Sequence, residues 1–218
     1  MRDIVLEHVG RDQSLRILDL GCGAGSLLVR LAEVFPSASI TGIDVSAANI
    51  AAAEQRLAVS MRDRVRLMVA DYLTFHDRPF DLIVCDGVLH LIPASTDALV
   101  AKLAGDLAAG GTLVCDMPYD GVYNRAFAIV RRLLRAVRSP VVDRAILGAG
   151  RLLHAREMND EGLRERVGYM YMPPERMMGA ALAHAFQTAG LRQTATHAML
   201  STSLSQLRHN VTVWAKTA

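Results

Sequence analysis

The chain has 218 residues, of which 51% are apolar and 21% charged, which is enough for one domain with a buried core and excludes intrinsic disorder. No apolar run approaches the roughly 18 residues of a membrane span, and the net charge of +2 does not indicate a nucleic-acid partner. No signal-peptide pattern is visible, and the three cysteines lie far apart in apolar runs. We therefore expect a cytoplasmic protein without membrane or nucleic-acid partners.

The first half of the chain alternates short β-branched runs with longer helical patterns. This alternation is typical of βαβ units built around a parallel sheet. Helices are expected over residues 26–34, after the N-cap Ser46, and from Ser95 or Thr96 to about Ala109. Five strands separate and flank these helices, at residues 16–20, 39–43, 65–69, 80–85 and 112–115.

The pattern changes in the second half. Residues 121–166 have a helical, arginine-rich pattern, and the proline pair at 173–174 is expected to open a helix that runs to about Ala189. Two last strands, at about 192–199 and 210–215, lie close enough in sequence to pair as an antiparallel hairpin. The chain is therefore expected to have an α/β fold with a helical block inserted after the fifth strand.

The loop between the first strand and the first of these helices is rich in glycine, with Gly21, Gly23 and Gly25. Such a loop lets a ligand approach the backbone, and the helix that follows presents N–H groups to it. Asp44 ends the next strand, where a carboxylate can accept hydrogen bonds from both hydroxyls of a ribose. These residues predict a nucleoside-binding site.

Two departures from the dinucleotide-binding fingerprint indicate which nucleoside binds. That fingerprint needs glycine at the sixth loop position, where this chain has Ser26. Asp19 lies two residues before Gly21, and its carboxylate would repel a pyrophosphate but attract a ligand that carries an ammonium and a sulfonium. The loop therefore favours S-adenosylmethionine over a nicotinamide dinucleotide.

Five segments resemble the motifs of the class I S-adenosylmethionine-dependent methyltransferases. The resemblance implies one methyltransferase domain over residues 1–218, with S-adenosyl-L-methionine as cofactor and S-adenosyl-L-homocysteine as product. It also implies a Rossmann-like, doubly wound, mostly parallel seven-stranded sheet with a C-terminal antiparallel hairpin and a helical insertion after strand 5. The segments are ILDLGCGAG (17–25), GIDVS (42–46), VADYLTF (69–75), FDLIVCDGVLHLI (80–92) and GGTLVCDMP (110–118).

The resemblance implies roles for residues on the methionine and ribose side of the cofactor. Gly21 and Gly23 would let the methionine portion lie against the loop, with Asp19 placed towards its ammonium. Asp44 would hold the ribose hydroxyls. Asp86, at the end of the fourth strand, would lie beside the methionine portion.

The resemblance also implies three residues on the adenine side. Val45 would cover one face of the ring, and Asp71 would accept a hydrogen bond from the adenine N6 amine. The backbone N–H of Tyr72 would contact the ring.

The sequence says less about the part of the site that would bind the methyl acceptor. Methyl transfer is an in-line displacement, so an enzyme gains mostly from positioning, and a base is needed only when the nucleophile carries a proton. His90 and Tyr119 are candidate catalytic residues because they follow the fourth and fifth strands. Tyr123, Tyr169 and Tyr171 are candidate substrate contacts, and the acceptor is expected to be a small, partly apolar metabolite.

Residues 117–176 are expected to form a helical lid that selects the substrate. The stretch 121–176 holds eleven arginines and six acidic residues, a net charge of +5, whereas the remainder of the chain has a net charge of −3. Most of these arginines fit the solvated face of an amphipathic helix, and one or two could bind a carboxylate or phosphate of the substrate.

Several alternatives stay open at this point. An NAD(P)-dependent oxidoreductase uses the same kind of sheet, and a non-catalytic regulatory protein could keep the cofactor site without turnover. No metal is expected, because Met117 stands where the magnesium site of catechol-type O-methyltransferases has an asparagine. The chain could be a monomer or a homodimer.

Overall fold

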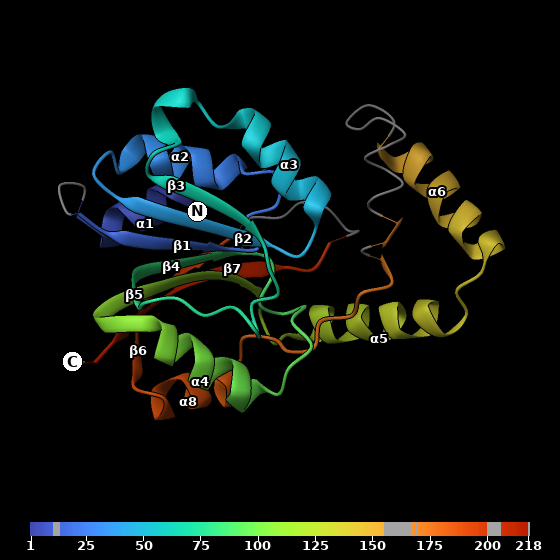
Figure 1. Cartoon of the computed structure of the whole chain (residues 1–218). Coiled ribbons are helices and arrows are strands. Elements are labelled where there is room, and N and C mark those ends of the chain that lie inside the picture. The colour runs from blue at the N-terminus through green and yellow to red at the C-terminus, as the bar shows by residue number, and fades with distance from the viewer. Residues whose placement is uncertain (11–13, 155–166, 169, 200–205, 218) are drawn as a thin grey trace. The chain divides into compact units, whose positions relative to one another are not determined.

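The computed structural model describes residues 1–10, 14–154, 167–168, 170–199 and 206–217 (Figure 1). The chain forms two compact units. Unit 1 comprises Met1–Tyr119 and Arg176–Ala218, and unit 2 comprises Asp120–Glu175. Within the described part of the chain, no helix combines the length and the apolar character that a membrane crossing requires.

Unit 1 is built on a seven-stranded sheet in the order β3-β2-β1-β4-β5-β7-β6. The first five strands run parallel, and β7 lies antiparallel between β5 and β6. The sheet confirms the predicted fold class, including the antiparallel hairpin. The strands are β1 (Arg16–Leu20), β2 (Ser39–Asp44), β3 (Val65–Val69), β4 (Phe80–Asp86), β5 (Leu107–Pro118), β6 (Leu191–Ala198) and β7 (His209–Lys216).

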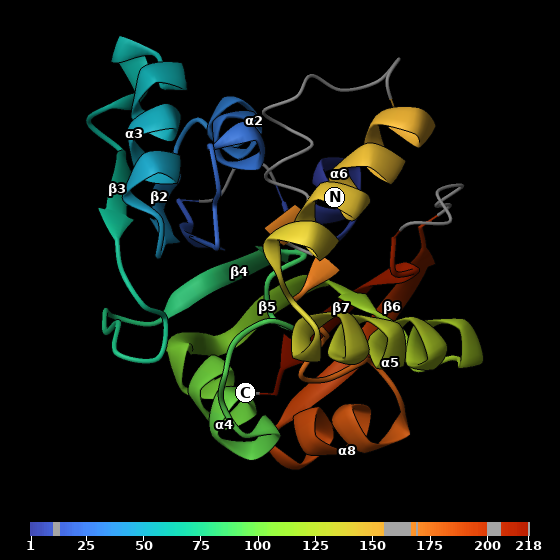
Figure 2. The ribbon, with the colours of Figure 1, turned by 90° about the vertical axis from the view of Figure 1, so that its right-hand side faces the viewer.

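Helices cover both faces of this sheet. Figures 1 and 2 show α2 and α3 on one side and α4 and α8 on the other, and α1 packs into the same core as α2 through the fully buried Val5. A short 3-10 turn, η1 (Val59–Met61), precedes β3. The helices are α1 (Arg2–His8), α2 (Ser26–Val34), α3 (Ala47–Arg56), α4 (Thr96–Asp106) and α8 (Ala180–Thr188).

Alternation along the strands decides which side chains face which layer. Val84 of β4 and Val114 of β5 lie in the core under α1, α2 and α3, whereas Ile83 and Leu113 lie in the core under α4 and α8. Residues two positions further along a strand point to the same face. Asp86 and Asp116 stand two positions after Val84 and Val114. Their side chains therefore lie on the α1–α3 side of the sheet.

The C-terminal end of α4 differs from the sequence expectation. The helix ends at Asp106 rather than near Ala109, and β5 begins at once with Leu107. Leu107 takes the strand conformation because burial of its apolar side chain in the core stabilises it there. The Lys216 ammonium donates to the carbonyls of Ala104 (2.6 Å) and Leu107 (2.7 Å), which satisfies groups that the helix end leaves unpaired.

The start of α8 was also predicted too early. The proline pair at 173–174 does not open the helix, which begins at Ala180 after the N-cap Gly179. The preceding residues run alongside the end of β5, where the Met178 N–H donates to the Pro118 carbonyl at 2.8 Å. This pairing keeps the backbone out of the helical conformation for several residues after the prolines.

Unit 2 contains the helices α5 (Val122–Ala136) and α6 (Pro140–His154). This confirms the helical insertion after the fifth strand. Two hydrogen bonds tie these helices to the segment 170–175. The Arg131 guanidinium donates to the Met172 carbonyl at 3.1 Å, and the Tyr171 hydroxyl donates to the Asp143 carboxylate at 2.5 Å.

Candidate cofactor and catalytic site

Asp44 joins the glycine loop to the end of β2. Its Oδ2 accepts the Gly23 N–H at 3.0 Å, while Oδ1 accepts the Ser46 N–H at 2.8 Å and the Asn49 side-chain amide at 3.2 Å. A carboxylate offers about four acceptor positions. Asp44 therefore fixes the loop and still has acceptor capacity on Oδ2 for a ribose hydroxyl.

The backbone of the loop leaves open space at Gly23. Gly21 and Gly23 both have a positive φ, which favours glycine. A Cβ on Gly21 would meet Val88 at 2.8 Å, but a Cβ on Gly23 would meet no heavy atom of the described chain within 4 Å. The surface over Gly23 can therefore receive a ligand.

Asp19 carries an electrostatic signal that fits a cationic ligand. It lies in β1 with only 1% of its surface exposed, and within the described residues its Oδ2 has no hydrogen-bond partner. Burial, together with the nearby carboxylates of Asp86 and Asp44, raises the pKa of Asp19 to about 7. A buried carboxylate is costly without a partner, so a ligand ammonium fits this position.

Asp86 ends β4 at the same edge of the sheet, and its side chain is exposed. Burial of part of the carboxyl and the neighbouring Asp116 raise its pKa, whereas the N-terminal ammonium and His209 lower it. The predicted residues Asp19, Asp44 and Asp86 are thus brought together at the carboxyl ends of β1, β2 and β4. Ligands bind at this edge in open α/β sheets.

An acid–base pair lies beside Asp86. Asp116 of β5 is in register with Asp86, and its Oδ2 is 3.0 Å from Nδ1 of His209, the first residue of β7. Since a carboxylate accepts hydrogen bonds, this contact favours the His209 tautomer with its hydrogen on Nδ1. Nε2 of His209 is then the nitrogen that can accept a proton from elsewhere.

His90 packs against this pair. Its ring meets the ring of His209 edge-on, with the centroids 5.3 Å apart and the planes at 86°. Only 5% of His90 is exposed, whereas 21% of the His209 side chain is. Of the two histidines, His209 is the more accessible to a substrate.

The loop that follows β4 is held by an arginine from a distant part of the sequence. Arg176 donates to the carbonyl of Leu89 at 2.6 Å and to the carbonyl of Ala94. The sequence analysis placed Arg176 at the end of the insertion, but the structure places it in unit 1. Arg176 therefore fixes the segment that carries His90.

The three predicted adenine contacts differ in what their side chains do. Val45 is 73% exposed and available to cover a ring. Asp71 is exposed, and its Oδ1 accepts the Leu73 N–H at 2.9 Å. The Tyr72 side chain is buried, which raises the pKa of its hydroxyl. The resemblance assigns the contact to the Tyr72 backbone N–H, and this role stays a prediction.

The four tyrosines expected on the acceptor side lie in different parts of the chain. Tyr119 is half-buried and pairs with Met178 in unit 1. Tyr123 and Tyr171 belong to unit 2, where Tyr123 stacks on a neighbouring phenylalanine and the Tyr171 hydroxyl is bound to Asp143. Tyr169 lies outside the described residues. The roles of all four remain predictions.

The sequence analysis missed the pairing of Asp116 with His209. Asp116 has a usable signal, because it lies near the end of the fifth strand, opposite Asp86 at the end of the fourth. His209 has none, because only the register of β7 against β5 brings it to the site. That register depends on tertiary packing rather than on any local pattern.

Comparison with known proteins assigns the family. Residues 11–137 match the methyltransferase domain family, which is more than half of the chain. The chain belongs to the class I S-adenosylmethionine-dependent methyltransferases, and S-adenosylmethionine is the cofactor of this family. None of these findings supports the oxidoreductase alternative.

Curated relatives match a little more than half of the chain. A trans-aconitate 2-methyltransferase of Variovorax paradoxus is 33% identical over 61% of this chain and 48% of its own length. A malonyl-[acyl-carrier protein] O-methyltransferase of Geobacter sulfurreducens is 32% identical over 56% of this chain and 45% of its own length. The chain thus spans about half the length of these relatives.

Solved structures share the fold over nearly the whole chain. The N-methyltransferase NodS of Bradyrhizobium japonicum superposes with a TM-score of 0.61 at 18% identity, covering 100% of this chain and 94% of that one. A methyltransferase of Methanosarcina mazei gives a TM-score of 0.67 at 17% identity, covering 98% and 97%. At these identities the likeness concerns the fold alone.

Proposed function

We propose that this protein transfers a methyl group from S-adenosylmethionine to a small-molecule acceptor. The observation that carries the proposal is the buried Asp19, whose Oδ2 has no partner among the described residues and which lies at the sheet edge where Gly23 leaves open space. When bound, S-adenosylmethionine supplies an electrophilic methyl group. The chain supplies the carboxylates that complement its positive charge.

The residues of the sheet edge divide the binding work. Asp19 binds the ammonium, and Asp44 accepts the ribose hydroxyls through the free acceptor position of Oδ2. Asp86 adds negative charge beside the methionine portion. Because Asp19 is buried, its attraction for a cation is weakened less by water than that of an exposed carboxylate.

His209 is the proposed general base on the acceptor side. Its Nε2 takes the proton of the acceptor nucleophile, while Asp116 holds Nδ1–H at 3.0 Å and stabilises the imidazolium. His90 packs edge-on against the ring and is a positioning residue. This arrangement suits an acceptor whose oxygen or nitrogen carries a proton.

The names of the curated relatives favour a second acceptor class. They are named for trans-aconitate and for malonyl groups, and an ionised carboxylate has no proton to lose. For such an acceptor, His209 would be idle and one or two arginines of residues 121–176 would supply the complementary charge. Activity measurements on His209 variants separate the two classes.

We assign the choice of acceptor to unit 2, the proposed substrate-selecting lid. Its support is chemical: this part of the chain combines a stacked Tyr123–Phe127 pair with the arginine-rich sequence. A partly apolar metabolite, rather than a nucleic acid, suits a chain with a net charge of only +2. We propose a cytoplasmic enzyme that acts as a monomer or homodimer.

Titration calorimetry with S-adenosylhomocysteine tests the cofactor site. Asp19→Asn should weaken binding at least about 30-fold at about pH 8, because the ammonium of the ligand loses its buried carboxylate partner. Asp63→Asn, which changes an exposed carboxyl after η1, is the matched control and should bind as the wild type does. NADH should not bind. Unchanged affinity of Asp19→Asn would overturn the assigned role.

The base is tested by methyl transfer to a panel of phenols, amines and carboxylic acids. With a proton-bearing acceptor, His209→Gln should lower kcat roughly 100- to 10,000-fold while the affinity for S-adenosylhomocysteine stays the same. His184→Gln, at an exposed position of α8, is the control. If only carboxylic acids are methylated and His209→Gln keeps full activity, His209 is not a base.

A further inference from the structure

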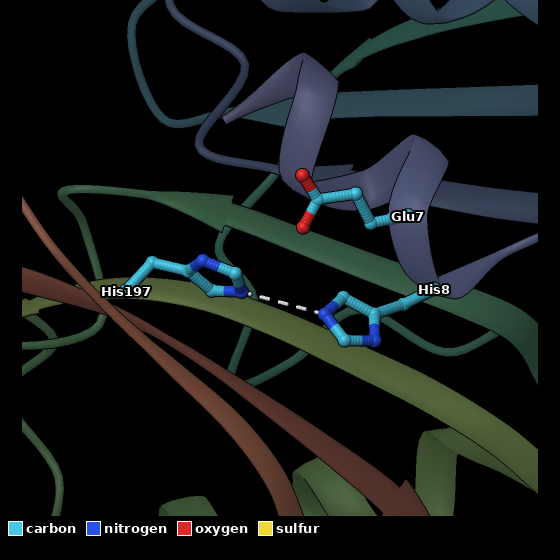
Figure 3. A group of neighbouring side chains, drawn as sticks. All are labelled: Glu7, His8 and His197. Carbon is cyan, nitrogen blue, oxygen red and sulfur yellow. Dashed lines mark hydrogen bonds between the residues drawn. The ribbon is translucent and has the colours of Figure 1, made fainter.

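Glu7, His8 and His197 form a cluster outside the proposed cofactor site (Figure 3). Glu7 and His8 close the C-terminal end of α1, and His197 lies near the end of β6. One ligand atom from each side chain lies within 4.8 Å of the other two. Figure 3 shows both imidazole rings and the carboxylate pointing into one gap.

The two histidines are spaced as ligands of one ion. Their Nε2 atoms are 3.4 Å apart, which is longer than the roughly 2.7–3.2 Å of good hydrogen bonds. Zinc–nitrogen bonds of about 2.0–2.1 Å at a tetrahedral angle place two ligand nitrogens about 3.3–3.4 Å apart. Right-angled coordination with the same bonds would place them only about 2.8–3.0 Å apart.

We infer that Glu7, His8 and His197 bind a zinc ion in tetrahedral geometry, with water as the fourth ligand. Two imidazoles and one carboxylate are donors that zinc accepts, and such sets with three protein ligands keep one position open. Glu7 and His8 are exposed and His197 is half-buried. The ion therefore reaches the site from solvent, and rotation of the exposed Glu7 side chain completes the set.

The site connects two parts of the chain that are 189 residues apart in sequence. It would hold the N-terminal helix, which contributes the buried Val5 to the core, to the edge strand of the sheet. His197 is paired with Val211, and Val211 with Asp116. The backbone of His197 thus lies in the same row of the sheet as that of Asp116, about 10 Å away across two strand spacings.

Zinc binding is tested on full-length protein without a polyhistidine tag and with reduced thiols. Calorimetry with zinc chloride should show one ion per chain, and zinc at about 100 times its dissociation constant should raise Tm by about 5–10 °C. His197→Ala should abolish both effects, and Glu7→Gln should weaken binding roughly tenfold. His76→Ala, an exposed histidine elsewhere in unit 1, should bind as the wild type does.

Two further readouts make the result decisive. Cobalt substituted for zinc should give the strong visible absorption bands of tetrahedral coordination, and weak octahedral bands would overturn the geometry. The metal-free His197→Ala variant should unfold at the same temperature as the metal-free wild type, so a lost response reports the ligand and not the fold. Absent binding, or equal binding to His197→Ala, would refute the site. Neither outcome bears on S-adenosylhomocysteine binding.

Discussion

Unit 1 and unit 2 use apolar side chains in opposite ways. In unit 1, strand residues such as Ile17, Val84 and Trp214 are completely buried between the sheet and its helices. In unit 2, Val122 is 87%, Leu133 62% and Val141 67% exposed, so most of each side chain is in contact with solvent. Unit 1 is therefore stabilised by a core, whereas unit 2 offers uncovered apolar surface.

Polar contacts show the same contrast. In the described part of unit 2, some hydrogen bonds join residues close in sequence, such as the paired bonds of Arg125 with Asp120 at 2.6 and 2.7 Å. In unit 1, the half-buried side chains of His209 and Lys216 are held by hydrogen bonds to residues from distant parts of the sequence. The comparison teaches that the proposed cofactor site lies in the unit with the larger buried core. The exposed apolar side chains of unit 2 suit its proposed role in the choice of acceptor.

The largest effect on stability is expected at Trp214. It is fully buried, packs on Phe186 with the ring centroids 4.7 Å apart, and its Nε1–H donates to Thr212 at 3.0 Å. Trp214→Ala should lower the free energy of unfolding by about 3–5 kcal/mol in urea titrations. Leu133→Ala in α5 should change it by no more than about 0.5 kcal/mol. A similar loss of unfolding free energy in the two variants would contradict the contrast between the core of unit 1 and the exposed surface of unit 2.

The second largest effect is expected on the free energy of unfolding of the cofactor-free Asp19→Asn variant. Because the folded pKa of Asp19 is about 7 and the model-peptide value is 3.8, the folded state keeps a proton that the unfolded chain has lost. Wild-type stability therefore falls as pH rises between these values, and asparagine escapes this loss. The stability advantage of Asp19→Asn should grow by roughly 2–3 kcal/mol from about pH 5 to about pH 8.

Urea titrations at both pH values measure this advantage. Asp63→Asn, at an exposed position, should show no such growth with pH. An Asp19→Asn variant that is less stable than the wild type at the higher pH would show that the carboxylate already has a compensating partner. Stability gained where binding is lost would mark Asp19 as a residue kept for its ligand.

The smallest of the three effects is expected at Lys216. Lys216→Met keeps the length of the side chain but removes the bonds to the carbonyls of Ala104 and Leu107. The free energy of unfolding should fall by about 1–2 kcal/mol, because two acceptors at the end of α4 lose a charged donor. Arg192→Met on the exposed edge of β6 is the matched control. Equal effects would show that the lysine adds no capping.

Much of unit 1 could be predicted because its signals are local. The β1 strand, the glycine loop and α2 follow from adjacent residues, and the predicted bounds 16–20 and 26–34 are those observed. The C-terminal end of α4 and the start of α8 could not be predicted in this way. They depend on Lys216 and on the pairing of Met178 with Pro118, which are contacts between distant segments.

The site residues also differ in whether a local sequence signal could predict them. Asp19, Asp44 and Asp86 were predictable, because each stands at or near the carboxyl end of a parallel strand and all such ends meet at one edge. His209 enters through an antiparallel strand whose register no local pattern specifies. The zinc ligands have the same origin, because nothing in the sequence around Glu7 points to His197.

The position of β7 has a consequence for biosynthesis. This strand follows every other strand in chain order, yet it lies inside the sheet between β5 and β6. On the ribosome, β5 therefore keeps an open edge until residues 209–216 have left the exit tunnel, and β6 has no partner to pair with. A nascent chain that is halted before this point lacks both His209 and the lysine that caps α4. It is then a natural client for chaperones that shield strand edges.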